Sequence, residues 1–349
     1  MAESATSWRE FSRGLLRVDS ERFDLRRGVR CGLVVVLPVL VGYLTGQVEA
    51  GVLVTMGALN LFFVEPPRPG TVGSRVLGVA AVANAAAFGA GTLVATLPRV
   101  FEVPLVAFGV TLALLPSVSV RWQGSSFIAA VMFVLPLGIP PTTFLGVALR
   151  PAAILAGGLL ALLLVVVEHS LVPTTPSSRP TNGAGPTTPT DLRTVGAHSA
   201  IVGVTAALGL LVGFELNLAR DYWVLLTVVV ALRFDLASTV AFSTARILGT
   251  VAGASVALGV TYASQDPWIL LAVLGFVSAL AFATRAVNYT VYALWVTIAI
   301  IVLLSLAYAG GPALAVTRVL DTLIGGALAL AASFLLWSLV HGSSRRRPT

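Results

Sequence analysis

The sequence contains no lysine, and all 22 of its basic residues are arginine. Two kinds of chemistry are thereby excluded from this chain. A Walker A phosphate loop needs its lysine, and a Schiff base forms on a lysine amine. An ATP-driven pump would therefore need its ATPase on a separate subunit.

Cysteine and histidine are almost as scarce. The single cysteine, Cys31, permits no internal disulfide and no cysteine metal cluster. The three histidines are scattered (His169, His198 and His341), and no Asp-Asp pair occurs anywhere in the chain. A membrane-embedded transferase would need clustered acids for a metal-diphosphate, or a histidine with a nearby acid as its base. We therefore expect no metal, no cofactor and no enzymatic activity.

Charge of either sign is also sparse, because only 11% of the residues are charged while 57% are hydrophobic. Soluble domains carry roughly 25% charged residues. Apolar stretches of the length that a bilayer requires, about 20 residues, recur along nearly the whole chain. The sequence predicts an all-α integral membrane protein with about 12 transmembrane helices. We place them at 31–48, 49–64, 75–97, 102–119, 124–140, 143–167, 196–216, 220–234, 245–263, 267–284, 288–307 and 313–340, of which the second, fifth and eighth are short enough to be re-entrant.

The arginines are concentrated at helix boundaries and at the two ends of the chain, so the net charge of +7 predicts orientation and not nucleic-acid binding. Cytoplasmic loops of membrane proteins carry an excess of basic residues. This rule places both termini in the cytoplasm and the chain in the cytoplasmic membrane. The inner side then holds Arg68, Arg75, Arg121, Arg179, Arg193, Arg233, Arg246 and Arg285, whereas the outer loops hold only Arg99 and Arg220.

A Pro/Thr/Ser/Gly-rich linker divides the chain near its midpoint and is predicted to be flexible. Seven arginines precede the first apolar run, so we expect no cleavable signal. The N-terminal segment is either a short amphipathic helix on an anionic leaflet or a solvated basic tail. The predicted domains are a basic N-terminal segment at 1–28, transmembrane repeat 1 at 29–171, the linker at 172–195, transmembrane repeat 2 at 196–341 and a basic tail at 342–349.

Two motifs recur in the halves at matching places. RVLG at 75–78 matches RILG at 246–249, and each opens a Gly/Ala-rich helix. Arg150 and Arg318 are each followed, after six residues, by Gly-Gly. The chain is therefore predicted to contain two parallel six-helix repeats, with a passage or cleft between the halves.

A family resemblance supports this interpretation. YWVLLTVVVALRFDLASTVAFSTARILGTVAGA at 222–254, together with RVLDTLIGGALALAASFLLW at 318–337, resembles the fusaric acid resistance (FUSC) or aromatic acid exporter superfamily. That superfamily also includes the aluminium-activated malate channels of plants. The first half departs from the pattern, since Val54-Thr55 stands where the second half has Leu-Thr and Gly78-Val79 where it has Gly-Thr. The resemblance implies movement of organic anions, aromatic or dicarboxylic acids, across the cytoplasmic membrane.

Arg150 and Arg318 are the strongest candidates for a substrate path. Each lies five to seven residues inside the outer end of a long helix, roughly 8–10 Å deep at 1.5 Å per residue. A charge inside the membrane usually faces a cavity or a partner, and the guanidinium fork suits a carboxylate. The alternative is that both side chains extend to the outer headgroups.

Three further residues belong to the same expected path. Asp321 follows Arg318 by three residues on one helix face, where it either pairs with Arg318 or carries a coupling proton. Asn60, in the short second span, needs a polar partner within the membrane. Trp223 is either an aromatic at the membrane interface or part of a stacking wall for an aromatic substrate.

A second group of residues is a candidate inner gate. Arg75 and Arg246 are expected to open their helices at the inner face, and an acid, Glu65 or Asp235, lies upstream of each. The gate would pair Arg75 with Glu65 and Arg246 with Asp235. The alternative is that both arginines contact lipid headgroups and only set the orientation of the chain.

The sequence thus favours a transporter or channel-like permease for organic anions, exporting aromatic or other carboxylic acids. A non-transporting membrane partner in envelope assembly is the alternative, and a membrane-embedded transferase is favoured less. The lipid bilayer and small organic anions are the expected partners. Whether several copies associate, and whether the protein is a channel or a proton-coupled carrier, stay open at this point.

Overall fold

The computed structural model describes residues 19–64, 74–119, 122–139, 143–171, 191–218, 220–307 and 311–344. Within these ranges the chain forms helices joined by short connections, and it forms no strand. The predictions made for residues 1–18, for Glu65, for residues 172–190 of the linker and for the last five residues of the tail lie outside the described residues.

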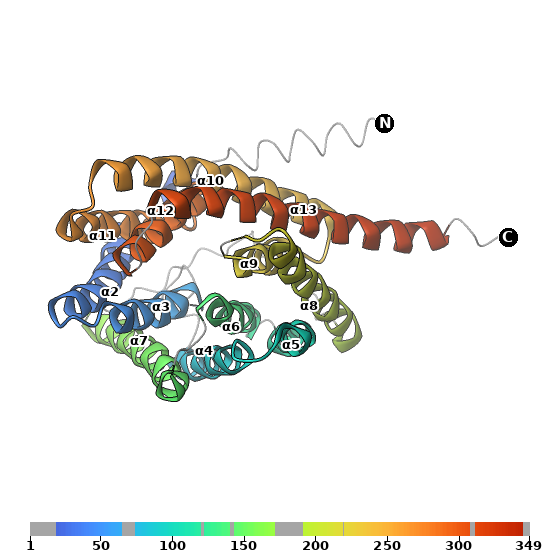
Figure 1. The fold of residues 1–349 in the computed structure, drawn as a ribbon, viewed down its shortest axis with the longest axis horizontal. Helices are drawn as coiled ribbons and strands as arrows, with labels where there is room; N and C mark the ends of the chain where they lie inside the picture. Colours follow the sequence, from blue (N-terminus) through green and yellow to red (C-terminus); the bar gives the residue numbers. More distant parts are fainter. Residues whose placement is uncertain are drawn as a thin grey trace. The chain divides into compact units, whose positions relative to one another are not determined.

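Each of the twelve expected segments is a helix (Figure 1). Nine are long and apolar enough to cross a membrane among the residues described, and the three shorter ones are the second, fifth and eighth, as expected. The all-α class and the multi-pass membrane character are confirmed, whereas twelve crossings stay a prediction. The helices are α2 (Leu25–Leu44), α3 (Val48–Val64), α4 (Ser74–Val94), α5 (Arg99–Leu114), α6 (Gln123–Val134), α7 (Phe144–Leu171), α8 (Leu192–Glu215), α9 (Tyr222–Ala231), α10 (Leu236–Ala263), α11 (Pro267–Thr284), α12 (Tyr289–Ala307) and α13 (Gly311–Ser344), with 3-10 turns at Ser20–Arg22, Leu115–Val118 and Leu135–Gly138.

Two helices begin well before their apolar stretches, and the reason is N-capping. Asp24 accepts a hydrogen bond from the backbone N–H of Arg27 at 3.0 Å, so α2 begins at Leu25 and not at 31. Asp235 accepts from the N–H of Ser238 at 2.7 Å, so α10 begins at Leu236 and not at 245. A capping carboxylate satisfies a backbone donor that the helix leaves unpaired. The polar first turns that follow each cap carry no hydropathy signal, and the predicted boundaries therefore fell too late.

The helices group into two compact units. Unit 1 comprises residues 1–49 and 208–349, and unit 2 comprises residues 50–207. The boundaries of the units fall inside α3 and α8, so the units differ from the two halves that the linker separates in the sequence.

The difference arises from the first helix of each half. In unit 1, α2 packs against α11 (Figure 1), and a Cβ added to Gly28 would lie 2.5 Å from the carbonyl oxygen of Ala279. In unit 2, the N-terminal part of α8 packs against α5, where the hydroxyl of Thr111 donates to the carbonyl of Ser199 at 3.3 Å. Small residues allow membrane helices to approach this closely. Unit 1 thus contains α2 from the first half of the sequence, and unit 2 contains the N-terminal part of α8 from the second half.

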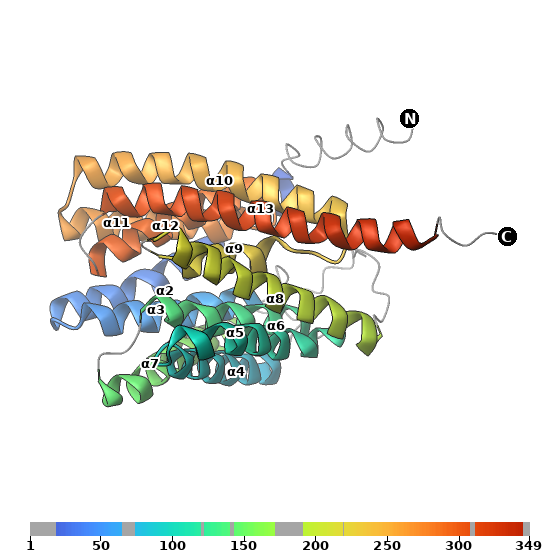
Figure 2. The same cartoon turned by 45° about the vertical axis from the view of Figure 1, so that its right-hand side comes forward.

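The remaining pairings recur in the same order in both units. In unit 2, α4 packs against α6 and α7, and α5 packs against α6. In unit 1, α10 packs against α12 and α13, and α11 packs against α12. Figure 2 shows α10 and α13 side by side over much of their length. This recurrence supports the predicted duplication, which the pairings alone do not establish.

Candidate functional site: a buried arginine on a tryptophan face

Helix α13 carries Arg318 and Asp321 on one face, one turn apart. Arg318 lies seven residues after the first residue of the helix, about 10 Å along its axis, and Asp321 lies about 15 Å along it. Their exposed fractions are 1% and 0%. Both charged groups therefore lie well inside unit 1, and Arg318 does not extend to a solvent-exposed edge.

The guanidinium of Arg318 lies over the indole ring of Trp223 in α9, with its central carbon 4.8 Å from the ring centroid. A cation on an aromatic face is stabilised by about 2 kcal/mol when the pair is desolvated. Close helix packing creates this contact, because a Cβ added to Gly325 of α13 would lie 2.5 Å from the carbonyl oxygen of Val224. Trp223 is itself 2% exposed.

Arg318 and Asp321 share a further feature, which is that their charged groups are not hydrogen-bonded within the described residues. The Nε and both terminal nitrogens of Arg318 make no hydrogen bond within the described residues, nor do the two carboxylate oxygens of Asp321. The expected pairing of Arg318 with Asp321 is therefore not formed as a hydrogen-bonded ion pair. A buried charge without a hydrogen-bonding partner is costly. The guanidinium thus presents an unfilled, planar donor set of the kind that binds carboxylates in a bidentate manner.

A second buried arginine lies within electrostatic reach of the first. The ionisable groups that act on Arg318 are Arg246, Tyr222, Asp321 and Tyr289. Arg246 is on α10, is 8% exposed, and its Nε makes no hydrogen bond within the described residues. Arg246 is therefore a second buried cation within electrostatic range of Arg318.

The expected position of Arg246 was wrong in one respect. It does not open its helix, because α10 begins at Leu236 and Arg246 follows ten residues later. Asp235 caps that helix, so the axial separation of Asp235 from Arg246 is about 16 Å at 1.5 Å per residue. The two residues therefore form no direct ion pair, and a role for them as a gate stays a prediction.

Arg75 does lie where the sequence predicts. It is the second residue of α4 and is exposed. Glu65, its expected partner, lies outside the described residues. Sequence matching pairs Arg75 with Arg246, yet one side chain is exposed and the other is buried.

Arg150 has different surroundings from Arg318. It is the seventh residue of α7, in unit 2, is only partly buried, and donates from a terminal nitrogen to the backbone carbonyl of Ile139. Asn60, also in unit 2, is 4% exposed and donates its amide N–H to the carbonyl of Met56 at 2.6 Å. The polar partner expected for Asn60 is thus a carbonyl of its own helix.

An equivalent helix contact within each unit shows which residues of the two units correspond. A Cβ added to Gly157 of α7 would meet the carbonyl oxygen of Val54, just as Gly325 meets that of Val224. On this register Leu53 takes the position of Trp223. The sequence comparison, which matches Val54-Thr55 to the Leu-Thr of the second half, is shifted by two residues from this structural correspondence.

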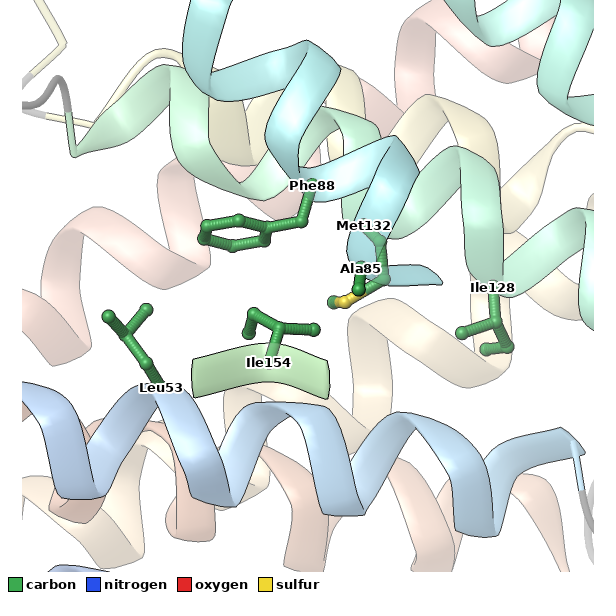
Figure 3. Close-up of a cluster of buried hydrophobic side chains, with 6 residues drawn as sticks. All are labelled: Leu53, Ala85, Phe88, Ile128, Met132 and Ile154. Carbon is green, nitrogen blue, oxygen red and sulfur yellow. The ribbon is translucent and has the colours of Figure 1, made fainter. Parts of the chain in front are cut away.

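The equivalent place in unit 2 is apolar. Helices α3, α4, α6 and α7 meet there in a cluster of buried hydrophobic side chains (Figure 3). Ala153, at the counterpart position of Asp321, packs against this cluster. The members are Leu53, Ala85, Phe88, Ile128, Met132 and Ile154. In unit 1 the buried guanidinium of Arg318 therefore lies over Trp223, whereas in unit 2 a hydrophobic cluster surrounds the positions that match Trp223 and Asp321.

Sequence reasoning missed several buried polar groups. Glu102 of α5 is 5% exposed and forms an ion pair with Arg99 at 2.9 Å. The i, i+3 spacing of the two residues could have indicated this pair. Asn84 of α4 is 2% exposed, and its amide has no hydrogen-bond partner in the described chain. Arg27 of α2 is 6% exposed. No three His, Cys, Asp or Glu side chains lie together as a metal site in the ranges described.

Comparison with known proteins agrees with the resemblance inferred from the sequence. Residues 205–332 match a family described as "Fusaric acid resistance protein-like". A relative from Neisseria gonorrhoeae, "Uncharacterized protein ORF2", is 32% identical over 148 residues, which are 40% of this chain and 34% of the relative. The chain thus spans about a third of the length of the curated relative that it matches. No solved structure matches.

The matched residues contain α9 to α12 and most of α13, so they hold Trp223, Arg246, Arg318 and Asp321. The part of this multi-pass membrane protein that contains the buried arginines, residues 205–332, is therefore the part that is similar to the family described as "Fusaric acid resistance protein-like".

Proposed function

We propose that this protein is a permease for organic anions, which exports aromatic or other carboxylic acids through unit 1. Arg318 carries the proposal, because its buried guanidinium lies over the ring of Trp223 and its three nitrogens make no hydrogen bond within the described residues. A carboxylate that enters would supply the missing acceptors, and an aromatic ring attached to it would find an indole beside the binding group.

The proposal assigns different tasks to the two matched arginines. Arg318 contacts the passing anion, whereas Arg150, bonded to a backbone carbonyl, holds the end of α7 against the turn at Ile139. Asp321 is the titratable group nearest to Arg318 along α13 and is the candidate for a coupling proton. The apolar cluster of unit 2 fits a supporting role for that unit.

The proposed setting is the cytoplasmic membrane, with twelve crossings and both termini in the cytoplasm. The distribution of arginine supports this orientation. A reporter enzyme that is active only in the cytoplasm should be active when fused at the linker and at either end. Activity at one of these three sites only would contradict the proposed topology.

Flux into proteoliposomes tests the proposal. The purified chain is reconstituted and the uptake of a panel of radiolabelled carboxylates is compared with that of a neutral solute of similar size. We expect carboxylate flux in the parent, a loss of at least tenfold in Arg318→Ala and a much smaller change in Arg150→Ala. An equal loss in both variants would contradict the separate roles.

A second outcome would remove the proposal itself. If the parent transports no carboxylate, or if Arg318→Ala transports as fast as the parent, the buried guanidinium is not part of an anion route. A chain that reconstitutes in folded form and moves no solute would favour the non-transporting partner in envelope assembly.

A further inference from the structure

Arg246 lies deep within unit 1 and has a surrounding of its own. It is about 15 Å along α10, roughly half of the hydrocarbon thickness. Close packing brings α10 onto α12 here, because a Cβ added to Gly249 would lie 2.6 Å from the carbonyl oxygen of Thr290. One turn further, Gly253 makes the same approach to the carbonyl of Leu294 at 2.5 Å. The stretch of α10 that follows Arg246 thus packs against the first turns of α12.

Tyr292 of α12 lies within electrostatic range of three arginines, Arg285, Arg246 and Arg27. Arg246 also acts on Arg318. Arg246 is therefore within electrostatic range of both Tyr292 and Arg318.

Aromatic rings continue from this point toward the loop that joins α9 to α10. Tyr292 and Tyr289 have ring centroids 5.9 Å apart, and Tyr289 meets Phe242 at 4.9 Å in an edge contact. The guanidinium of Arg233 lies over the Phe242 ring at 4.1 Å. This row of rings therefore ends at Arg233 on one side, and Tyr292 on its other side is within electrostatic range of Arg246.

Two buried guanidinium groups that feel each other's field repel, and this repulsion is strong where water is excluded. Asp321 on α13 is an acid within electrostatic range of Arg318, and within the described residues its carboxylate oxygens make no hydrogen bond to either cation. Anions that bind to them lower this repulsion. A multi-site route of this kind also allows an anion to leave, because binding at each site need not be tight.

We propose that Arg246 forms a second anion subsite, distinct from that of Arg318 and framed by Tyr289 and Tyr292, which takes the carboxylate of an aromatic acid. This inference rests on the proposed function. Anions would then pass from Trp223 and Arg318 to Arg246 and on along the rings toward Arg233.

Calorimetric titration of the purified full-length protein with benzoate tests this inference. We expect two benzoate ions per chain in the parent, one in Arg246→Gln, one in Arg318→Gln and none in the double variant. Arg75→Gln is the matched control, since Arg75 is the sequence counterpart of Arg246 but is exposed, and it should keep both binding events.

The outcomes separate this inference from the proposed function. If Arg246→Gln still binds two benzoate ions, or if it loses both at once, there is no distinct second subsite, while a loss of one ion in Arg318→Gln would still support the Arg318 route. If the parent binds no benzoate, both proposals fail.

Arg246→Lys is a second test variant, which keeps the inference testable when Arg246→Gln does not fold. It keeps the positive charge but loses the planar fork, so we expect two binding events with the weaker one reduced about tenfold in affinity. Unchanged affinity at both sites, together with the thermal unfolding midpoint of the parent, would contradict a carboxylate held by the fork of Arg246.

Discussion

Arg318 and Trp223 are 95 residues apart in the sequence, and in the folded protein the guanidinium carbon of one lies 4.8 Å from the ring centroid of the other. The contact exists because Gly325, two turns further along α13, lets that helix lie against the backbone of α9. A buried cation is thereby held over the face of the indole ring.

Trp223→Leu should weaken anion transport without abolishing it. Leucine is the residue at the matching position of unit 2, so it fits a comparable helix contact while removing the aromatic face. The loss of a desolvated cation–π contact of about 1–2 kcal/mol predicts a rise in the half-saturating carboxylate concentration of about tenfold. Flux measured over a range of concentrations checks this, and Trp268→Leu, at an exposed site, should behave like the parent.

Asp321→Asn tests proton coupling directly. The amide keeps the shape of the carboxylate but cannot exchange a proton, so a coupled carrier should lose its response to an imposed proton gradient while still allowing downhill flux. The measurement compares carboxylate flux with and without a pH difference across the liposome membrane. Asp191→Asn, at an exposed position before α8, is the control. A response in Asp321→Asn equal to that of the parent would exclude Asp321 as the coupling group.

Gly325→Ala should destabilise the protein, because the added methyl group would lie 2.5 Å from the carbonyl oxygen of Val224. Overpacking of this kind costs about 1–3 kcal/mol. Thermal unfolding in detergent should show a lowered midpoint, and carboxylate flux should fall with it because α13 moves away from Trp223. Gly259→Ala is the matched control on α10, where an added Cβ meets nothing within 4 Å. A midpoint in Gly325→Ala as high as in Gly259→Ala would show that the helices are less tightly packed.

Two variants of Asp235 distinguish a role as a helix cap from a role as a gate. As an N-cap it stabilises α10 by about 1 kcal/mol, so Asp235→Ala should lower the unfolding midpoint and Asp235→Asn, which also caps helices well, should restore it. A gate that depends on the negative charge of Asp235 would instead change flux in both variants. Flux and unfolding measured on the same preparations decide between the two roles.

The early start of α10 shows why a helix boundary is hard to predict from hydropathy. Polar residues precede or interrupt the apolar stretch of α10, namely Ser238, Thr239, Ser243 and Arg246. A hydropathy pattern therefore places them outside the membrane helix. The cap at Asp235 and burial against neighbouring helices make them helical, and burial follows from residues that are distant in the sequence. The assignment of Arg246 to the helix opening was wrong for this reason.

Arg150 and Arg318 show that the surroundings of a site residue are equally hard to predict from the sequence. The spacing to Gly-Gly correctly places Arg150 and Arg318 at comparable depths of α7 and α13, because helical rise is a local property. The spacing does not predict that the side chain of Arg150 donates to the carbonyl of Ile139 while that of Arg318 lies on Trp223. Those partners come from other elements, and in unit 2 the aromatic ring is replaced by Leu53.

The sequence by itself determined the membrane class, the number and order of the helical segments and the residues of α13 on which the site is built. Each of these depends on composition or on periodicity along one helix, and both are local. Only the tertiary structure decided that α2 packs with helices of the second half and the N-terminal part of α8 with those of the first, that Arg246 is buried within electrostatic range of Arg318, and that hydrophobic side chains fill the matching place in unit 2. Such pairings depend on which small residues let two distant backbones come into contact, and no single segment contains that information.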